Sequence, residues 1–306
     1  MMIFLIIILN LLTVLFLPFL MIGIIKKTKA FWGGRYGASV FQPLYDFIKL
    51  IKKDFVISNT TSTIFRLTPL ISFAAIIIAA VFVPLISGTA IINIPAGLIV
   101  FAYLLALGKF FNCIGAMDTG SSFEGMGTSR EACFTSIVEP AFFIILGSIM
   151  ALSGNYTFES LSKITTNAGS YGVLIIIFAV LALFLMVLIE GCRVPVDDPA
   201  THLELTMIHE VMILDNSGFD LALITWASGI KMLLITSLIA KIIIPTGSPL
   251  YALYYLITIF LVSIIIGTAE SSMARIRMSH IFEFIFIMSS FALIVMSLVG
   301  AKVFGG

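Results

Sequence analysis

Charged residues are scarce in this chain of 306 residues: they make up 11% of it, whereas hydrophobic residues make up 60%. A soluble domain carries about a quarter charged residues, so a water-soluble monomer is excluded, and so is a disordered chain. The net charge of +1 gives no basic excess for a nucleic-acid partner. The three cysteines form no CxxC pair, so neither a disulfide framework nor a zinc site is expected. What remains is a polytopic membrane protein.

Long apolar runs organise the whole sequence. A helix needs about 20 mostly apolar residues to cross a bilayer, and the runs are continuously apolar, which argues against a membrane β-barrel. The candidate spans are residues 2–25, 64–86, 93–112, 130–152, 171–191, 221–244, 250–269 and 280–301. The expected fold is all-α: a single transmembrane domain, 1–306, of about eight transmembrane helices, with one interfacial amphipathic helix.

Basic residues divide the loops into two sides. The first, third, fifth and seventh loops hold most of the lysines and arginines, whereas the other side has only Lys163, Lys241 and Lys302. The positive-inside rule places the odd-numbered loops in the cytoplasm and both termini outside, so the cytoplasmic (inner) membrane is the expected location. Nearly all acidic residues lie in or near the same cytoplasmic half, although Asp and Glu contribute little to topology. Carboxylates are therefore expected to have a function there.

The first cytoplasmic loop contains an amphipathic segment at residues 38–53. Its apolar residues recur at helical spacing from Val40 to Ile51, and the opposite face carries Gln42, Asp46, Lys49 and Lys53. This pattern is typical of a helix in the membrane interface, and an ordinary surface helix fits it equally well. The following stretch, 58–63, supplies N-cap candidates for the second span.

Ionisable residues inside a span are costly and mark functional candidates. Glu139 lies about nine residues into the fourth run, about 13 Å from its edge at 1.5 Å per residue, and Lys231 lies at a similar depth in the sixth. Their matched depth permits an ion pair between them. Glu283 is close to the start of the eighth run, from which its side chain can reach the interface.

The fifth loop, 190–220, is the densest charged cytoplasmic segment. Its ionisable residues are Glu190, Arg193, Asp197, Asp198, His202, Glu204, His209, Glu210, Asp215 and Asp220. The composition of 201–214 favours a helix. No HExxH or ExxH motif is present, so no metal site is expected. Clustered acids raise one another's proton affinity and His titrates near neutrality, which favours a chain of protonatable groups; a solvated acidic loop is the alternative.

The third loop, GAMDTGSSFEGMGTSRE, is rich in Gly and Ser but lacks GxxxxGK and GxGxxG. It is expected to re-enter the membrane tightly, with Thr128 or Ser129 as the N-cap of the fourth span. No nucleophile elbow or pair of catalytic carboxylates is visible, so we expect no catalytic residue and no cofactor in this chain.

Four motifs resemble those of subunit 1 of respiratory complex I and its relatives, the membrane-anchor subunits of energy-converting NiFe hydrogenases. The first is RYGASVFQPLYDFIKLIKKD at 35–54, with Gln42, Pro43, Asp46, Lys49, Leu50 and Lys53. The second is the spacing of Arg130 and Glu139. The third is a signature loop at Glu190, Arg193, Pro195, Asp197, Glu204 and Leu205. The fourth is the pair Arg275 and Arg277.

Departures from that pattern distinguish branches of the family. Val196 replaces a Phe, and Ala200 and His202 replace two acids, in the loop that shapes the quinone cavity of quinone-reducing members. These changes count against a quinone site. The segments SSFEGMGTSRE and SMARIR resemble the hydrogenase branch, of formate hydrogenlyase and hydrogenase-4 type, whose members pass electrons to protons.

The resemblance implies a subunit that anchors a peripheral hydrogenase module and couples its electron transfer to proton or Na⁺ translocation. Fe–S clusters and a NiFe centre would belong to partners: the peripheral large and small hydrogenase subunits on the cytoplasmic side. Antiporter-like membrane subunits and the lipid bilayer would be further partners. A quinone-site subunit of a complex I-like oxidoreductase and a free-standing secondary transporter are the alternatives.

The resemblance and the charge pattern together assign residues to two sets. Those expected to couple ions are Glu131, Glu139, Glu190, Arg193, Asp197, Asp198, His202, Glu204, His209, Glu210, Asp215 and Lys231. Those expected to dock the peripheral arm are Arg35, Gln42, Asp46, Lys49, Arg275 and Arg277. In the first set the glutamates at 139, 190, 204 and 210 would carry protons and the two histidines would relay them. Arg193 and Asp197 would orient the loop, Arg130 would tune Glu131, and Lys231 would balance a buried carboxylate.

Overall fold

The computed structural model describes residues 2–54, 56–154, 157–164, 169–198, 207–245 and 247–305, and these residues contain helices and no strand. The α-helices are α1 (Met2–Trp32), α2 (Gln42–Ile51), α3 (Thr63–Phe82), α4 (Gly97–Asp118), α5 (Ser122–Ser153), α7 (Gly172–Glu190), α8 (Gly218–Ile243), α9 (Tyr251–Ser272) and α10 (Met278–Gly305). Three short 3₁₀ helices are η1 (Phe158–Lys163), η2 (Gly169–Tyr171) and η3 (Glu210–Ile213).

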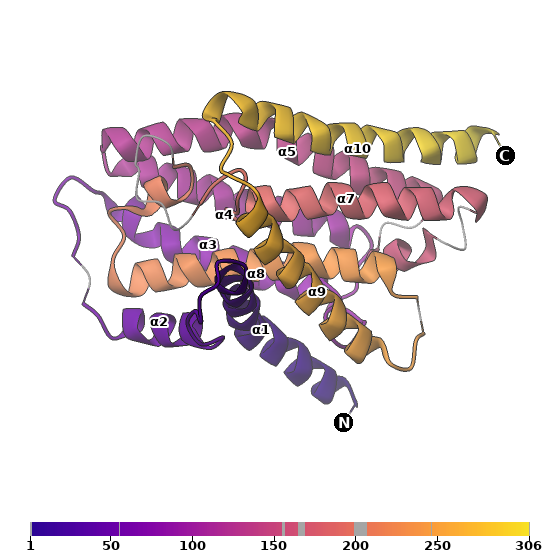
Figure 1. Ribbon diagram of the computed structural model, residues 1–306, viewed down its shortest axis with the longest axis horizontal. Helices are drawn as coiled ribbons and strands as arrows, with labels where there is room; N and C mark the ends of the chain where they lie inside the picture. Colours follow the sequence, from indigo (N-terminus) through magenta and orange to yellow (C-terminus); the bar gives the residue numbers. More distant parts are fainter. Residues whose placement is uncertain are drawn as a thin grey trace.

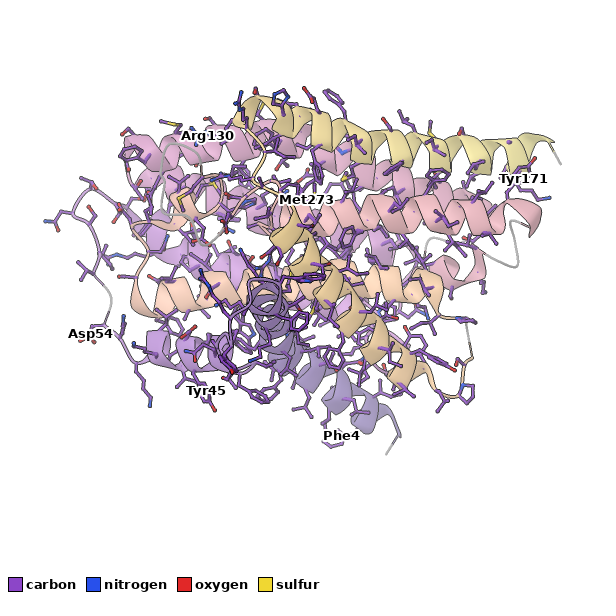
Figure 2. All side chains as sticks on the ribbon, in the orientation of Figure 1. Phe4, Tyr45, Asp54, Arg130, Tyr171 and Met273 are labelled. Atoms are coloured by element: carbon purple, nitrogen blue, oxygen red, sulfur yellow. The ribbon has the colours of Figure 1, made fainter. Side chains whose placement is uncertain are left out.

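Eight of the described helices, all except α2, are long and apolar enough to cross a membrane. The all-α fold with eight spans is therefore confirmed (Figure 1). Figure 2 shows Tyr45, Asp54 and Arg130 toward one end of the molecule and Tyr171 at the other, so α2 and the first turns of α5 share an end.

The two N-cap predictions have different outcomes. The prediction that Thr128 or Ser129 caps the fourth span is wrong, because α5 begins at Ser122 and both residues lie inside it. Apolar runs mark only the part of a helix that lies in lipid, and α5 continues beyond it as a polar extension. The N-cap predicted within 58–63 is confirmed: the Ser62 hydroxyl accepts a hydrogen bond from the Ile64 N–H at 3.2 Å.

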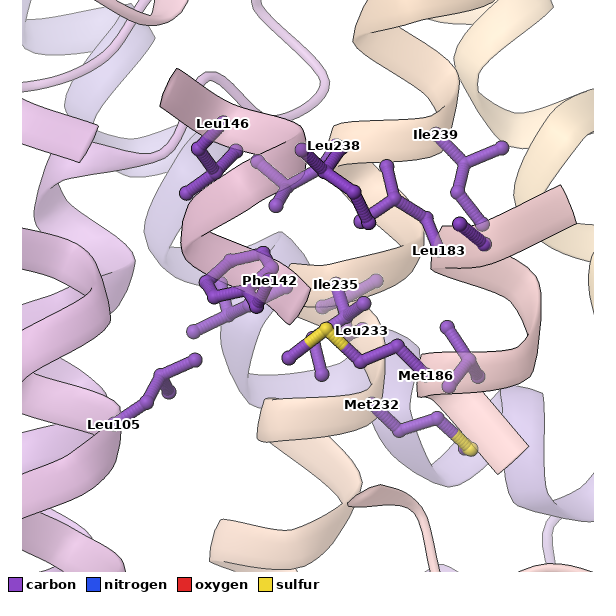
Figure 3. Packing of buried hydrophobic residues seen from close by; sticks show 14 of the residues in the cluster. Leu105, Phe142, Leu146, Leu183, Met186, Met232, Leu233, Ile235, Leu238 and Ile239 are labelled. Carbon is purple, nitrogen blue, oxygen red and sulfur yellow. The ribbon is translucent and has the colours of Figure 1, made fainter. Parts of the chain in front are cut away.

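Helix α8 lies at the centre of the bundle, in contact with α1, α2, α3, α7 and α9. In its most apolar stretch 78% of the residues are buried, against 28–50% in the other seven spans. Leu233, Ile235 and Leu238 of α8 are fully buried, and Figure 3 shows them packed with Phe142 of α5 and Met186 of α7. This core fixes α5, α7 and α8 relative to one another, and these three helices carry much of the charged site described below.

Helices α1 and α9 pack closely against each other and cross the rest of the bundle obliquely (Figure 1). The close approach depends on Gly267 of α9: a Cβ there would lie 2.9 Å from the Ile25 carbonyl oxygen and 2.7 Å from Cβ of Thr28. One turn further along α9, Glu270 reaches Lys29 of α1, with Oε2 and Nζ 3.5 Å apart.

The amphipathic helix predicted at 38–53 forms as the shorter α2. Phe47 fastens it to the bundle, with ring centroids 5.1 Å from Phe19 of α1 and 4.8 Å from Trp226 of α8. The apolar residues Tyr45 and Ile48 remain exposed. An exposed apolar face suits a helix lying in the membrane interface, and that location stays a prediction.

The helix predicted over 201–214 is wrong in its described part. Met207, Ile208 and His209 are not helical, and only the 3₁₀ turn η3 follows them. The reason is that Asp197 Oδ2 accepts hydrogen bonds from the backbone N–H groups of Ile208, at 3.1 Å, and His209, at 3.0 Å. Those N–H groups are then not available to a helical ladder. His202 and Glu204 lie outside the described residues.

Candidate functional site

Lys109, near the middle of α4, is surrounded by carboxylates. Its Nζ lies 2.6 Å from Glu190 Oε1, 3.7 Å from Glu131 Oε1 and 3.8 Å from Glu139 Oε1. It also donates a hydrogen bond to Thr135 at 3.1 Å. Three acids from two helices, α5 and α7, therefore share one ammonium group inside the bundle.

The ion pair considered between Glu139 and Lys231 is not what forms. Lys231 Nζ instead lies 3.1 Å from Glu190 Oε2, at the end of α7. Glu190 thus bridges two lysines, Lys109 and Lys231, and balances them from one carboxylate. Lys231 does face a buried carboxylate, as predicted, but on α7 instead of α5.

His209 joins this cluster to the loop beyond α7. Its Nε2 lies 3.1 Å from Glu131 Oε2 and its Nδ1 lies 3.8 Å from Asp197 Oδ2. Burial tends to lower the pKa of His209, but Cys192, the Glu131 carboxylate and Asp197 hold it well above its usual range. The imidazole is therefore placed to keep a proton between two carboxylates.

Small residues let the loop approach α5 so closely. A Cβ on Gly127 would lie 3.0 Å from the Ile208 carbonyl oxygen and would meet the side chain of Val211. Gly127 is one helical turn before Glu131, so the missing side chain makes room for the segment that carries His209. The same segment is tied down again where buried Glu124 accepts the Asp215 N–H at 3.0 Å.

Asp197 anchors the described part of the charged loop. It is fully buried, and besides the two N–H groups already named it accepts one from Asp198 at 3.0 Å. Arg275, after α9, donates at 3.0 Å to Oδ1, the same oxygen that accepts the Asp198 N–H. Burial tends to raise the pKa of Asp197, but hydrogen bonding and charge from His209 and Arg275 hold it below its usual range. Asp197 is therefore an ionised structural anchor.

A second branch leads from the loop to α1. Arg193 Nη1 lies 3.4 Å from Glu270 Oε1, and Lys29 Nζ lies 3.5 Å from the other Glu270 oxygen. Lys29 is also 3.9 Å from Asp198. Two cations and two carboxylates balance here, which is the arrangement of a structural clamp between α1, α9 and the loop.

The central cluster is not balanced in the same way. Lys109 and Lys231 face three carboxylates, those of Glu131, Glu139 and Glu190, which leaves one negative charge in excess. A proton on His209 supplies the missing positive charge. Such a cluster can hold one exchangeable proton, or one cation, and pass it along a row of contacts.

Several residues assigned from the sequence lie apart from this row. Arg130 donates to the Met207 carbonyl oxygen at 2.8 Å, which holds the loop; a tuning effect on Glu131 stays a prediction. Asp215 is exposed and Glu210 is half-buried in η3. Glu283 is 70% exposed at the start of α10 and pairs with His280 at 2.8 Å, in keeping with a position at the interface.

The residues expected to dock a peripheral arm fall into two groups. Arg35, Lys49 and Arg277 are exposed, and Gln42 donates to Asp46 at 2.8 Å on α2. Arg275 instead lies inside the site, on Asp197. Arg277, only two residues further along the chain, is exposed and makes no such contact with Asp197.

Sequence reasoning missed Lys109, Lys29, Glu270 and Glu124 as site residues. Lys109 lies near the end of the apolar run 93–112, where a basic residue is typical of the edge of a span, yet α4 continues to Asp118. Extension of the predicted helix beyond residue 112 would have placed Lys109 well inside it. Among the described residues, no group of three His, Cys, Asp or Glu side chains is arranged to hold a metal ion.

Comparison with known proteins identifies the family. The NADH dehydrogenase family matches residues 3–300. Hydrogenase-4 component C of Escherichia coli (strain K12) is 30% identical over 264 residues, which are 83% of this chain and 82% of that protein. Formate hydrogenlyase subunit 4 of the same strain is 27% identical over 268 residues, 85% and 86% of the two chains.

More distant relatives agree with this result. An NADH-quinone oxidoreductase subunit of Phenylobacterium zucineum (strain HLK1) is 25% identical over 187 residues, 56% of this chain and 51% of that protein. The fold matches a chain of the membrane-bound sulfane sulfur reductase, an archaeal respiratory membrane complex, with a TM-score of 0.82, 19% identity and coverage of 98% and 100% of the two chains. The resemblance predicted from the motifs is confirmed, and the chain belongs to the NADH dehydrogenase family.

Proposed function

We propose that this chain is the membrane subunit of a multi-subunit, redox-driven ion pump in the cytoplasmic membrane, with both termini outside. It anchors a peripheral hydrogenase module, whose subunits hold the Fe–S clusters and the NiFe centre, and couples their electron transfer to the movement of H⁺ or Na⁺. Two relatives with hydrogenase or hydrogenlyase in their names align over more than 80% of this chain, whereas relatives named as quinone or ubiquinone oxidoreductases align over 56–71%. This difference favours the hydrogenase branch over a quinone-site subunit.

The observation that carries the proposal is the continuous row of charged groups. It runs from Arg275 and Asp197 in the loop region, through His209 and Glu131, to Lys109 and its carboxylates, with neighbouring charged atoms 2.6–3.8 Å apart. A charge that appears at one end changes the proton affinity of the next group along the row.

The energies are large enough for coupling. Two unit charges 4 Å apart interact by about 4 kcal/mol at an effective dielectric constant of 20. Moving one elementary charge through 100 mV takes about 2.3 kcal/mol. The interaction energy of one pair of charges in the row is therefore at least as large as the free energy needed to move one ion against a membrane potential of 100 mV.

The row of charged groups reaches the surface of this chain at Glu139. This residue lies within a span and 34% of its side chain is exposed, whereas Glu131 and Glu190 are nearly buried. A carboxylate that faces lipid at this depth is costly, so we infer that a neighbouring membrane subunit covers this face of α5. An antiporter-like subunit that carries its own ionisable residues would continue the path. At the loop end, the peripheral module would dock on the surface that includes Lys49 and Arg277.

The proposal is tested with Glu139→Gln in the intact complex. We expect hydrogen evolution by inverted membrane vesicles to continue while the associated uptake of H⁺ or Na⁺ falls at least tenfold, because the amide cannot take up a proton. Glu283→Gln is the matched control: it makes the same substitution at an exposed glutamate on α10, and uptake should match the unaltered complex.

Unchanged ion uptake in Glu139→Gln would remove this residue from the path. Purification of the unaltered chain with no soluble redox subunit attached would contradict the anchoring role and favour a free-standing transporter. Inhibition of the complex by quinone-site inhibitors, without hydrogen evolution, would favour the quinone-site alternative.

A further inference from the structure

A cleft of about 600 Å³ opens where α1 ends, away from the row of charges just described. The end of α1, the loop after it and the end of α9 form its walls. The lining residues are Lys26, Lys29, Ala30, Trp32, Gly33, Arg35, Gly37, Glu270 and Ser271. Its volume suits a small polar group, such as a phosphodiester with its substituents.

The cleft carries an excess of positive charge. Its one acidic lining residue, Glu270, is already engaged by Lys29 at 3.5 Å and by Arg193 at 3.4 Å. Lys26 and Arg35 are exposed, and neither has a carboxylate partner in the described part of the chain. Two cations that lack a counter-ion among the described residues therefore line the same open space.

The shape of the loop holds Arg35 over this space. The Arg35 N–H donates to the Ala30 carbonyl oxygen at 2.8 Å, and Lys27 Nζ donates to the Tyr36 carbonyl oxygen at 2.6 Å. Both bonds fold the loop back onto the last turns of α1. The backbone of Arg35 is thus held in place at the cleft that Lys26 also lines.

The depth of the cleft identifies the medium that it meets. The apolar part of α1 ends at Ile25, so Lys26 to Trp32 extends about 10 Å beyond it, at 1.5 Å per residue. The headgroup region on each side of a bilayer is about 5–8 Å thick, so this segment starts at the hydrocarbon edge and crosses that region. Phe31, Trp32 and Tyr36 are 62–97% exposed on the same segment, and exposed aromatic rings are typical of membrane–water interfaces.

We propose that this cleft binds the phosphodiester headgroup of an anionic phospholipid, with Lys26 and Arg35 as its ligands and Trp32 against the glycerol region. Arg35 then serves the lipid and not the docking of the peripheral arm that its motif predicts. Basic clefts between transmembrane helices at the cytoplasmic surface take such headgroups, and a guanidinium binds phosphate oxygens in a bidentate manner. Glu270 and Lys29 close the floor of the cleft. A bound lipid would therefore brace the clamp between α1 and α9.

The test measures binding of dioleoyl-phosphatidylglycerol to the full chain in detergent by native mass spectrometry. The variant is Lys26→Ala with Arg35→Ala, and the matched control is Lys52→Ala with Lys53→Ala, two exposed lysines outside the cleft. Each basic residue near an anionic lipid contributes about fivefold to affinity, so the cleft variant should bind about thirtyfold more weakly. The control should bind like the unaltered chain.

A charge-conserving variant and a zwitterionic lipid serve as further controls for headgroup recognition. Lys26→Arg with Arg35→Lys keeps both charges and should restore binding, which also shows that the site tolerates substitution. Dioleoyl-phosphatidylcholine should bind weakly to every form. Equal weakening in the cleft and control variants, or equal binding of both lipids, overturns the proposal.

Two other occupants give distinct results. Displacement of phosphatidylglycerol by millimolar inorganic phosphate would make the cleft a site for free phosphate. Loss of soluble subunits from the cleft variant, with its phosphatidylglycerol binding unchanged, would make it a contact for an acidic protein segment. Either result refutes a lipid site and leaves the proposed pump function intact, because that function depends on Glu139.

Discussion

The contact between Lys109 and Glu190 is the most sensitive point of the charged row. The two groups are 2.6 Å apart, and their side chains are only 11% and 6% exposed. Removal of one partner of a buried ion pair costs about 3–5 kcal/mol, because it leaves an uncompensated charge. We expect Lys109→Met to reach this range, since three carboxylates would then lose their shared counter-ion.

The cost of Glu190→Gln should be smaller. Lys109 would keep Glu131 at 3.7 Å and Glu139 at 3.8 Å as partners, whereas Lys231 would lose Glu190 Oε2 at 3.1 Å. The amide oxygen of the glutamine can still accept from one of the two lysines, so the loss is closer to that of one charged hydrogen bond, about 1.5–3 kcal/mol. In the double variant the missing lysine and the missing carboxylate compensate each other. The two single effects should therefore exceed the double effect by about 2–3 kcal/mol, at the upper end of measured interaction energies.

The assay is unfolding of the full chain by SDS in mixed micelles, followed by circular dichroism. Lys49→Met, an exposed lysine on α2, is the matched control and should change the unfolding free energy by less than about 0.5 kcal/mol. If the single effects of Lys109→Met and Glu190→Gln simply add, the two side chains do not interact, and the row is broken at its centre.

Two further variants test the loop end of the row. Arg275→Gln should lower the unfolding free energy by about 1.5–3 kcal/mol, because it removes a charged donor from buried Asp197. Arg277 is exposed and two residues away, so Arg277→Gln should change the unfolding free energy by less than about 0.5 kcal/mol. Equal effects of the two substitutions would contradict the separate placement of the two arginines. Because the pKa of His209 is raised in the folded chain, its contribution should be complete below about pH 6.5 and should be lost as the pH rises through the raised value. The unfolding free energies of the unaltered chain and His209→Gln, compared between pH 5 and 10, should therefore converge at high pH, and a constant difference would mean that His209 carries no proton.

The spans and their order could be predicted from the sequence, because an apolar run of sufficient length has few alternatives to a membrane helix. The cap at Ser62 was predictable for a similar reason, since a hydroxyl before a helix satisfies an otherwise unpaired N–H group. Both signals are local. The end of α4 could not be predicted in this way. Its apolar run contains Lys109 near the end, and the helix then continues through polar residues to Asp118.

The partners within the site could not be predicted, because they come from different helices. The matched depths of Glu139 and Lys231 along their spans suggested an ion pair between them. Which side chains meet, however, depends on the rotation of α5 and α8 about their axes, and no short sequence pattern specifies that rotation. Gly127 shows the same limit. It differs from Gly125 only in facing the loop at Ile208, whereas a Cβ at Gly125 would meet nothing within 4 Å.

The distribution of burial within the cluster argues for a direction of transfer. Glu131 and Glu190 are nearly enclosed and have fixed cationic neighbours, so a proton that reaches them has to leave through another member of the row. Glu139 touches Lys109 at 3.8 Å and is also open to the outer face of α5. A shift of Lys109 toward Glu190 would leave Glu139 without its counter-ion, and a carboxylate in that state takes up a proton from its surroundings. A shift in the other direction would release it. Under the proposed function, movement of one ammonium group between these two carboxylates would link a charge change at the loop to proton exchange at the side of the bundle.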